Sequence, residues 1–168
     1  FNAIACTVAV PNSEIIMTLK VAINGLGRIG RSTLAAIIES GRTDIEVVAI
    51  NAPGPLETHA HLLRYDSVHG RFPHKITFSG NTIDVGTGPI DVQATYNASE
   101  LNWDGVDVVL ECTGAHNSKE ACLIHLANGA KRVLISAPGK NADKTVVYGV
   151  NHNELTSDDL IVSNASCT

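Results

Sequence analysis

The chain has 168 residues, of which 44% are hydrophobic and 17% charged, and its formal net charge is -5. A chain of this length can bury the core of one domain, and its composition is typical of a globular protein. No apolar run approaches the roughly 20 residues that cross a bilayer, and the 12 basic residues are scattered along the chain. These features argue against a membrane or a nucleic acid as partner and favour a small molecule.

The first strand pattern starts only after Met17, the one methionine of the sequence. Residues 1–16 contain no Lys or Arg, so they lack the basic start of a secretory signal and the arginine-rich character of a transit peptide. We therefore expect residues 1–17 to be an extra segment outside the fold, either translated upstream sequence or an appended remnant. Residues 18–168 are expected to form the domain.

The four cysteines lack the close pairs of a zinc site and the density of a disulfide scaffold, which fits a reducing cytoplasm. His59 and His61 form the one close histidine pair, but two residues apart on a helix they would point to different faces. No metal site is therefore expected.

The first predicted elements form a strand, a glycine turn and a helix. Residues 19–24 are mostly apolar, residues 25–30 read Gly-Leu-Gly-Arg-Ile-Gly, and apolar residues then recur at helical spacing from Leu34 to Ile38. Gly41 stands where a left-handed C-terminal cap belongs. Residues 45–50 form a β-branched run that predicts a second strand, buried on both faces. Together these segments predict one βαβ unit.

Strands and helices continue to alternate beyond this unit. Helices are expected over 56–65 and 118–128, and strands over 75–78, 82–85, 90–94, 106–111, 132–136 and 161–163. Turn residues separate the three weaker segments between 75 and 94, as in antiparallel hairpins. The sequence therefore predicts an α/β fold of the Rossmann type, a doubly wound, mostly parallel sheet with a small antiparallel ribbon.

The three glycines of the first turn predict a dinucleotide site. Gly25 permits the tight turn, Gly27 lets the backbone approach a pyrophosphate, and Gly30 lets the helix pack close to the strand. The unpaired amides and the positive dipole end of the helix then favour phosphate binding. A simple glycine-rich turn would not need three glycines in this register, between a strand and a helix.

Ala52 stands where such a site normally has an acidic residue that binds the ribose hydroxyls. Without the acidic residue, the site loses a charged hydrogen-bond acceptor worth about 1.5 to 3 kcal/mol. It also loses the negative charge that would repel a 2′-phosphate. No Arg or Lys occurs in residues 53–57 to attract that phosphate. We therefore predict relaxed cofactor choice, with NAD favoured and NADP accepted.

Residues 163–168, Ser-Asn-Ala-Ser-Cys-Thr, follow an apolar strand and are expected to open a helix. A helix N-terminus stabilises a thiolate, so Cys167 is the candidate nucleophile. Cys112 and Cys122 lack such a setting and are interpreted as small buried hydrophobes.

Several motifs in the same order and spacing resemble glyceraldehyde-3-phosphate dehydrogenase of the bacterial type, over residues 19–168. They are Val21 to Arg31, His61 to Ser67, Glu111 to Gly114, Ser136 to Lys140, Gly149 to His152 and Ser163 to Thr168.

The resemblance implies roles for individual residues. Arg28 and Ile29 would touch the pyrophosphate. Residues that would line the adenosine and nicotinamide-ribose side are Thr113, Gly114 and Ser136. Cys167 would form the thiohemiacetal with the aldehyde, and Ser166 and Thr168 would belong to a phosphate pocket.

The resemblance also implies what the whole protein does. Family members oxidise glyceraldehyde 3-phosphate with inorganic phosphate as co-substrate, act as cytoplasmic homotetramers and use a histidine of a second domain as base. This sequence departs from the pattern at Ala52, at Tyr96, where relatives often have a basic residue near the adenine, and after Thr168. We therefore expect a partial or truncated sequence that binds dinucleotide with negligible turnover.

Two alternatives stay open. Erythrose-4-phosphate dehydrogenase shares the cysteine and the type of segment found at His69 to Phe72. The other alternative is a dinucleotide-binding module without catalytic function.

Overall fold

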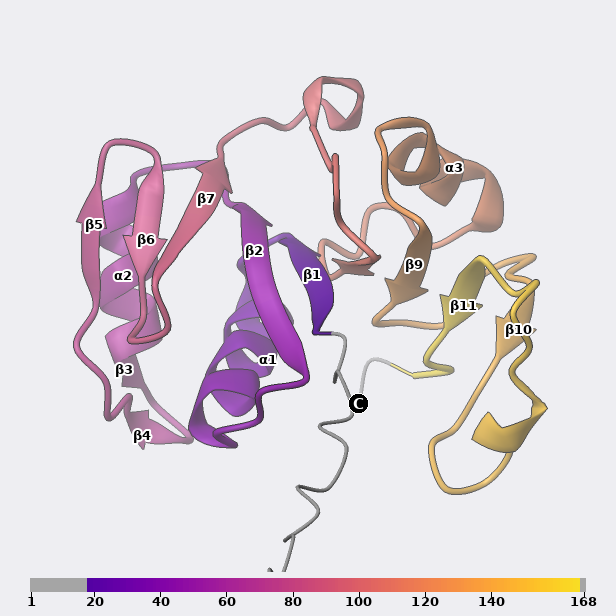
Figure 1. Cartoon of the computed structure of the whole chain (residues 1–168), viewed down its shortest axis with the longest axis horizontal. Helices are drawn as coiled ribbons and strands as arrows, with labels where there is room; N and C mark the ends of the chain where they lie inside the picture. Colours follow the sequence, from indigo (N-terminus) through magenta and orange to yellow (C-terminus); the bar gives the residue numbers. More distant parts are fainter. Residues whose placement is uncertain (1–17, 167–168) are drawn as a thin grey trace, which may run out of the picture.

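The computed structural model describes residues 18–166, and a nine-stranded sheet forms its centre (Figure 1). The strand order is β10-β11-β9-β8-β1-β2-β7-β6-β5. All neighbours from β10 to β7 pair in parallel, whereas β5, β6 and β7 form an antiparallel ribbon. The strands are β1 (Leu19–Asn24), β2 (Ile45–Asn51), β5 (Thr77–Ser79), β6 (Thr82–Asp84), β7 (Pro89–Gln93), β8 (Val108–Glu111), β9 (Arg132–Ile135), β10 (Lys144–Thr145) and β11 (Ile161–Ser163). This confirms the predicted fold class.

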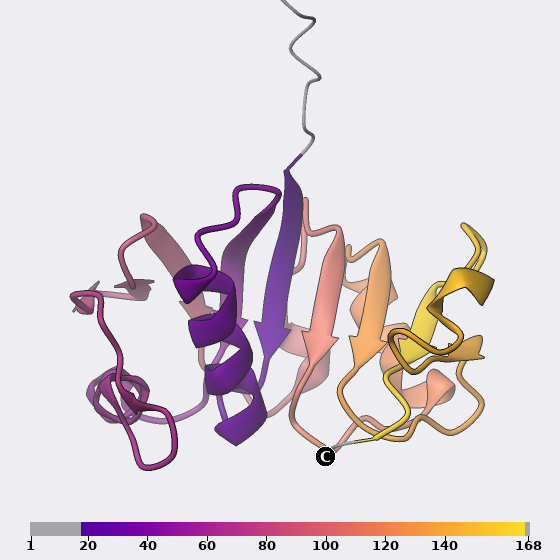
Figure 2. The ribbon, with the colours of Figure 1, turned by 90° about the horizontal axis from the view of Figure 1, so that it is seen from below.

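Helices cover both faces of the sheet. They are α1 (Arg28–Glu39), α2 (Leu56–Arg64) and α3 (Lys119–Ala127), with short 3₁₀ turns η1 (Ala98–Glu100) and η2 (His152–Glu154). Figure 2 shows α1 lying against one face. None of the helices in residues 18–166 is long and apolar enough to span a membrane.

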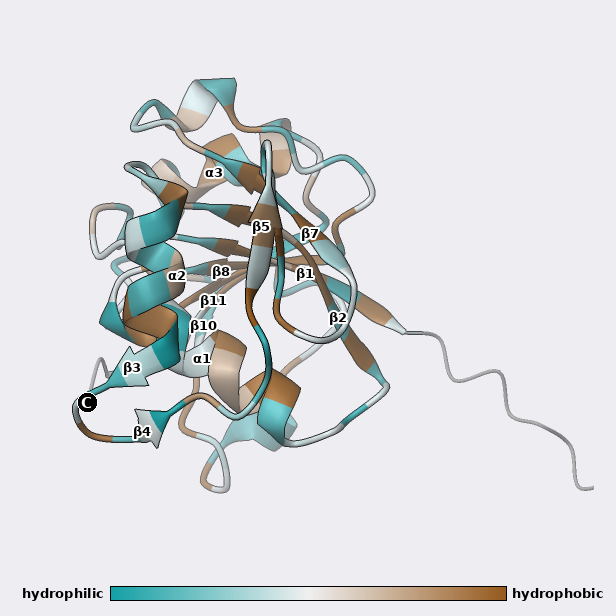
Figure 3. Ribbon diagram, turned by 90° about the vertical axis from the view of Figure 1, so that its left-hand side faces the viewer, coloured by the Kyte–Doolittle hydropathy of each residue, from teal (hydrophilic) through white to brown (hydrophobic). Residues whose placement is uncertain are grey.

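The alternation of side chains along β1 explains the two layers. Ile23 packs in one apolar cluster with Leu34 of α1, whereas its neighbour Ala22 packs in another with Trp103 and Val109. Successive strand residues point to opposite faces, so a strand covered on both sides is apolar at consecutive positions. In Figure 3 hydrophobic residues concentrate in the sheet, whereas α2 is largely hydrophilic.

Three strands were not predicted from the sequence. They are β10 and the pair β3 (Tyr65–Asp66) and β4 (Gly70–Arg71), which form a separate antiparallel ribbon. Each has two residues, too few to show an alternating pattern. The predicted strand over 106–111 begins later, at Val108, because Val106 N–H closes a turn onto Trp103 O at 3.0 Å.

Candidate functional site

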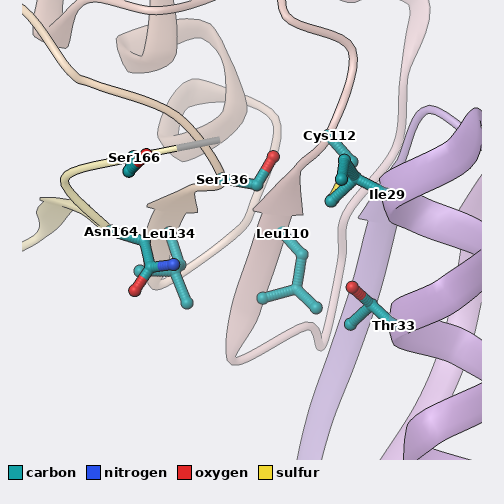
Figure 4. A pocket seen from close by; sticks show the side chains of 8 residues that line it. All are labelled: Ile29, Thr33, Leu110, Cys112, Leu134, Ser136, Asn164 and Ser166. Carbon is teal, nitrogen blue, oxygen red and sulfur yellow. The ribbon is translucent and has the colours of Figure 1, made fainter. Parts of the chain in front are cut away.

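The carboxyl ends of the parallel strands form an edge with two adjoining cavities. The first has a volume of about 490 Å³ and lies at the ends of β1 and β2. The second, of about 340 Å³, lies between α1 and the ends of β8, β9 and β11 (Figure 4). Cys112 lines both cavities. Ligands of open parallel sheets bind in a crevice at this edge, where the strand order reverses, and here β1 has β2 on one side and β8 on the other.

Gly25 and Gly30 are required by the fold itself. Gly25 has φ +96°, and a Cβ there would lie 2.8 Å from Thr113 Cγ2. A Cβ on Gly30 would lie 2.0 Å from the carbonyl oxygen of Gly25. These contacts hold the start of α1 close to the end of β1, as the sequence pattern predicted.

Gly27 is different, because the fold does not need a glycine there. Its φ is −73°, which any residue adopts, and an added Cβ would meet nothing within 4 Å. Gly27 lines the first cavity. The open space above this backbone is what a ligand that approaches the main chain requires.

The start of α1 is electrostatically suited to an anion. The helix begins at Arg28 after the N-cap Gly27, with no side-chain cap and no acidic residue in its first turn. The first amides of a helix have no partner within it, and the helix dipole makes this end positive. They can therefore donate to a phosphate.

The side chains of Arg28 and Ile29 point to different surroundings. Both terminal nitrogens of Arg28 bind the carboxylate of Asp66, at 2.7 and 3.2 Å. Ile29 lines the second cavity together with Thr33 (Figure 4). A contact of Arg28 with a pyrophosphate through its backbone amide would leave the pair with Asp66 intact.

The residues predicted to face the nucleosides lie at the ends of β8 and β9. Thr113 lines the first cavity and Ser136 the second. Ser136 Oγ also donates to the carbonyl oxygen of Glu111 at 2.9 Å. Gly114 lies in the turn after Thr113, with φ +73°, but does not line either cavity.

Ala52 packs into the core rather than onto the cavity wall. It is 1% exposed and belongs to the same apolar cluster as Leu26 and Ala60. Its neighbours Asn51 and Pro53 line the first cavity. Ala52 itself therefore does not line this cavity. Its predicted influence on the cofactor comes from the carboxylate that is missing at this position.

A chain of buried polar side chains underlies the first cavity. Asn51 Nδ2 donates to Asn24 Oδ1 at 2.8 Å, and Asn24 Nδ2 donates to Glu111 Oε2 at 2.6 Å. These three residues end the adjacent strands β2, β1 and β8. Buried polar groups need such partners, so the network fixes the strand ends relative to one another.

Glu111 is the centre of this network. Its carboxylate accepts hydrogen bonds from Thr113 N at 2.8 Å, from Thr113 Oγ1, and from His125 Nε2 at 3.0 Å. Burial by itself would raise the pKa of Glu111, but the hydrogen bonds from His125, Thr113 and Asn24 outweigh it and lower that pKa. Glu111 is thus a buried, ionised residue that orients the Thr113 side chain.

His125 links this carboxylate to Trp103. Trp103 Nε1 donates to His125 Nδ1 at 3.1 Å, so Nε2 carries the hydrogen that is donated to Glu111. His116 Nδ1 lies 3.6 Å from Glu111 Oε2, and the ligand atoms of Glu111, His116 and His125 lie within 4.8 Å of one another. A metal ion on His125 Nε2 would displace the hydrogen that is donated to Glu111. The ring hydrogen would then move to Nδ1, which could no longer accept from Trp103.

The sequence pattern does not predict this network. Glu111 occurs there only within a motif that carries the family resemblance, and no role is predicted for His125. The available signal was an acidic residue within a Val-rich strand and a histidine within a helix whose neighbours are apolar, since buried groups of this kind are almost always paired.

The thiols of the described residues are not activated. Cys122 is fully buried, as predicted, whereas Cys112 is only half-buried. Burial raises the pKa of Cys112 to about 11 and that of Cys122 to about 12. The predicted nucleophile Cys167 and the predicted phosphate ligand Thr168 lie outside the described residues. Ser166, the other predicted phosphate ligand, lines the second cavity with Asn164 (Figure 4).

Comparison with known proteins gives the family. The model of the family "Glyceraldehyde 3-phosphate dehydrogenase, NAD binding domain" matches residues 19–119. A glyceraldehyde-3-phosphate dehydrogenase of Cereibacter sphaeroides is 66% identical over 152 residues, which are 90% of this chain and 46% of the relative. Those of Xanthobacter flavus and Pseudomonas aeruginosa are 65% and 50% identical, with the same coverage of both chains. The chain spans about half the length of the curated relatives that it matches. It belongs to the glyceraldehyde-3-phosphate dehydrogenase family and contains the NAD-binding domain of that family.

Proposed function

We propose that the two adjoining cavities hold NAD, with its pyrophosphate over the glycine turn. The observation that carries this proposal is the open space at Gly27. Gly25 and Gly30 are explained by φ +96° and by a 2.0 Å contact, but neither reason applies to Gly27. A ligand that lies against the backbone supplies the missing reason.

Each part of the dinucleotide has candidate partners. The backbone amides of Arg28 and Ile29 would hold the pyrophosphate at the start of α1. Thr113 and Gly114 would lie on the adenosine side and Ser136 on the nicotinamide-ribose side. Ala52 offers no carboxylate to the ribose hydroxyls, so the site would favour NAD but also accept NADP.

For the whole protein we propose the phosphorylating oxidation of glyceraldehyde 3-phosphate. The Cys167 thiolate would form a bond to the aldehyde carbon, whose oxygen becomes the alkoxide of a thiohemiacetal. Bound NAD supplies the hydride acceptor that turns this adduct into a thioester. Inorganic phosphate would then attack the thioester carbon and release the thiolate, leaving an acyl phosphate. Ser166 and Thr168 would contribute to a phosphate pocket.

Three further proposals concern the setting of the domain. Residues 18–168 form the domain and residues 1–17 an additional segment. The whole protein acts as a homotetramer in the cytoplasm. The 168 residues by themselves bind dinucleotide with negligible turnover, because catalytic groups act as a unit and the base of family members comes from a second domain.

Titration calorimetry with NAD tests the binding site. The chain should bind NAD, and Gly27→Val should weaken binding about tenfold or more, a loss of roughly 1.4 kcal/mol or more, because its side chain fills the space for the pyrophosphate. The variant should keep its circular dichroism spectrum, since an added Cβ meets no protein atom within 4 Å. Its melting temperature should fall by only a few degrees, through the loss of a glycine N-cap. Unchanged affinity in folded Gly27→Val would contradict the proposal.

A further inference from the structure

We propose that Arg31 and His59 form a subsite for the 2′-phosphate of a bound NADP, and that this subsite, together with Ala52, makes the cofactor choice. The inference rests on the proposed dinucleotide site. Residues 53–57 contain no Arg or Lys, so the sequence by itself predicts no cation for the 2′-phosphate. The fold instead brings Arg31 of α1 to the cavity that Pro53 lines.

Arg31 is a cation without a counter-ion. It is half-buried on α1 and takes part in none of the ion pairs within residues 18–166. Its Nη1 donates to Leu26 O at 3.0 Å, while its Nε is buried without a hydrogen-bond partner. Because a partly desolvated charge is costly without a partner, this guanidinium is suited to an incoming anion.

Asp66 cannot serve as that partner in the arrangement observed. Its two carboxylate oxygens bind both terminal nitrogens of Arg28, and Oδ1 also accepts from the backbone amides of Val68 and His69 at 2.8 Å each. Glu39 lines a separate pocket with Arg31 and Asp66, but neither carboxylate forms an ion pair with Arg31.

His59 reaches the same cavity from the first turn of α2. Its ring lies 3.1 Å from Pro53 O through Nε2, so Nε2 carries the hydrogen. Its Nδ1 is buried and has no partner. Because Nδ1 has no partner, the ring keeps one polar atom for a group bound in this cavity.

The surroundings of the two residues match the position of a ribose 2′-substituent. Arg31 and His59 line the first cavity beside Leu26 of the glycine turn and beside Asn51 and Pro53 at the end of β2. None of the residues that line this cavity is acidic. In dinucleotide sites the end of the second strand faces the ribose. A 2′-phosphate bound there would occupy the position that an acidic side chain has in other dinucleotide sites, where this chain has Ala52.

The amides at the start of α1 form a separate anion site. They lie at Gly27 and Arg28, whereas the Arg31 guanidinium is held against the carbonyl oxygen of Leu26. Loss of Arg31 should therefore affect NADP much more than NAD. This difference separates a specificity role from a general one in pyrophosphate binding.

Calorimetric titration of the whole chain with NAD and with NADP tests the subsite. Arg31→Gln should raise the Kd for NADP about tenfold or more and that for NAD less than about threefold, in line with the loss of a charge-assisted hydrogen bond. His59→Gln should raise the Kd for NADP about threefold. Adenosine 2′,5′-bisphosphate compared with AMP should repeat the pattern without the nicotinamide.

Arg64 provides the matched control. It is also half-buried, donates to a carbonyl oxygen at 3.0 Å, that of Ile76, and lies outside the dinucleotide cavities. Arg64→Gln should leave both Kd values unchanged. The subsite would be refuted if the wild type binds NAD but discriminates against NADP by a hundredfold or more. It would also be refuted if folded Arg31→Gln loses both cofactors equally. A wild type that binds neither would instead refute the dinucleotide site itself.

Discussion

The guanidinium of Arg28 and the carboxylate of Asp66 form a bidentate ion pair, with N–O distances of 2.7 and 3.2 Å. Arg28 begins α1 and Asp66 belongs to the β3–β4 ribbon, so the pair ties that ribbon to the helix end that would face the pyrophosphate. Asp66 also accepts from the amides of His69 and Val68, which closes the turn between β3 and β4.

The acid stability of the chain should depend on Asp66. The amides of His69 and Val68, followed by Arg28, lower its pKa from 3.8 to about 2. Because the folded-state pKa is below the unfolded one, the stabilisation is complete above about pH 4 and is lost as the pH falls toward 2. Asp66→Asn should therefore melt at a lower temperature than the wild type at pH 7, and the difference should shrink between pH 4 and 2. A difference independent of pH in that window would contradict this account.

Gly30→Ala should destabilise the fold strongly. Its methyl group would lie 2.0 Å from Gly25 O, so α1 must move away from the end of β1, at a cost of about 3 kcal/mol. The control is Gly27→Ala, whose methyl group meets open space and should change stability by no more than about 1 kcal/mol, because the loss of a glycine N-cap opposes the gain from a less flexible unfolded chain. Urea denaturation measures both. Equal stability of the two variants would be inconsistent with the close approach.

His125 should stabilise the fold through its hydrogen bonds rather than through the volume of its ring. His125→Leu leaves the Glu111 carboxylate and the Trp103 N–H each short of a partner, and should cost about 2 to 5 kcal/mol. His125→Gln offers one donor and one acceptor, so it should recover much of that loss. Trp103 is the only tryptophan, so its fluorescence follows unfolding in urea. Gln and Leu variants of equal stability would show that only packing is involved.

Cys112 and Cys122 should resist alkylation in the folded protein. With pKa values raised to about 11 and about 12, fewer than about one thiol in a thousand is ionised at pH 8. Iodoacetamide treatment followed by peptide mass spectrometry measures each cysteine separately, with urea-unfolded protein as the control. Labelling of Cys112 at the rate of the unfolded chain would contradict the burial of its thiol.

The sequence by itself was sufficient for the fold class and for the glycine turn. Consecutive apolar residues in β1 and β2, and helical spacing from Leu34 to Ile38, are local patterns whose period reports secondary structure. The three glycines carry information because each has a distinct steric reason, and two of these reasons appear as a φ of +96° at Gly25 and a 2.0 Å contact at Gly30.

Only the tertiary structure brought together groups that are distant in sequence. Glu111, His125 and Asn24 come from β8, α3 and β1 and meet because the strand ends share one edge of the sheet. Arg31 and His59 line one cavity although they lie on different helices. Local periodicity contains no information on which distant polar side chains become partners. That depends on strand order and on the burial that makes an unpaired polar group costly.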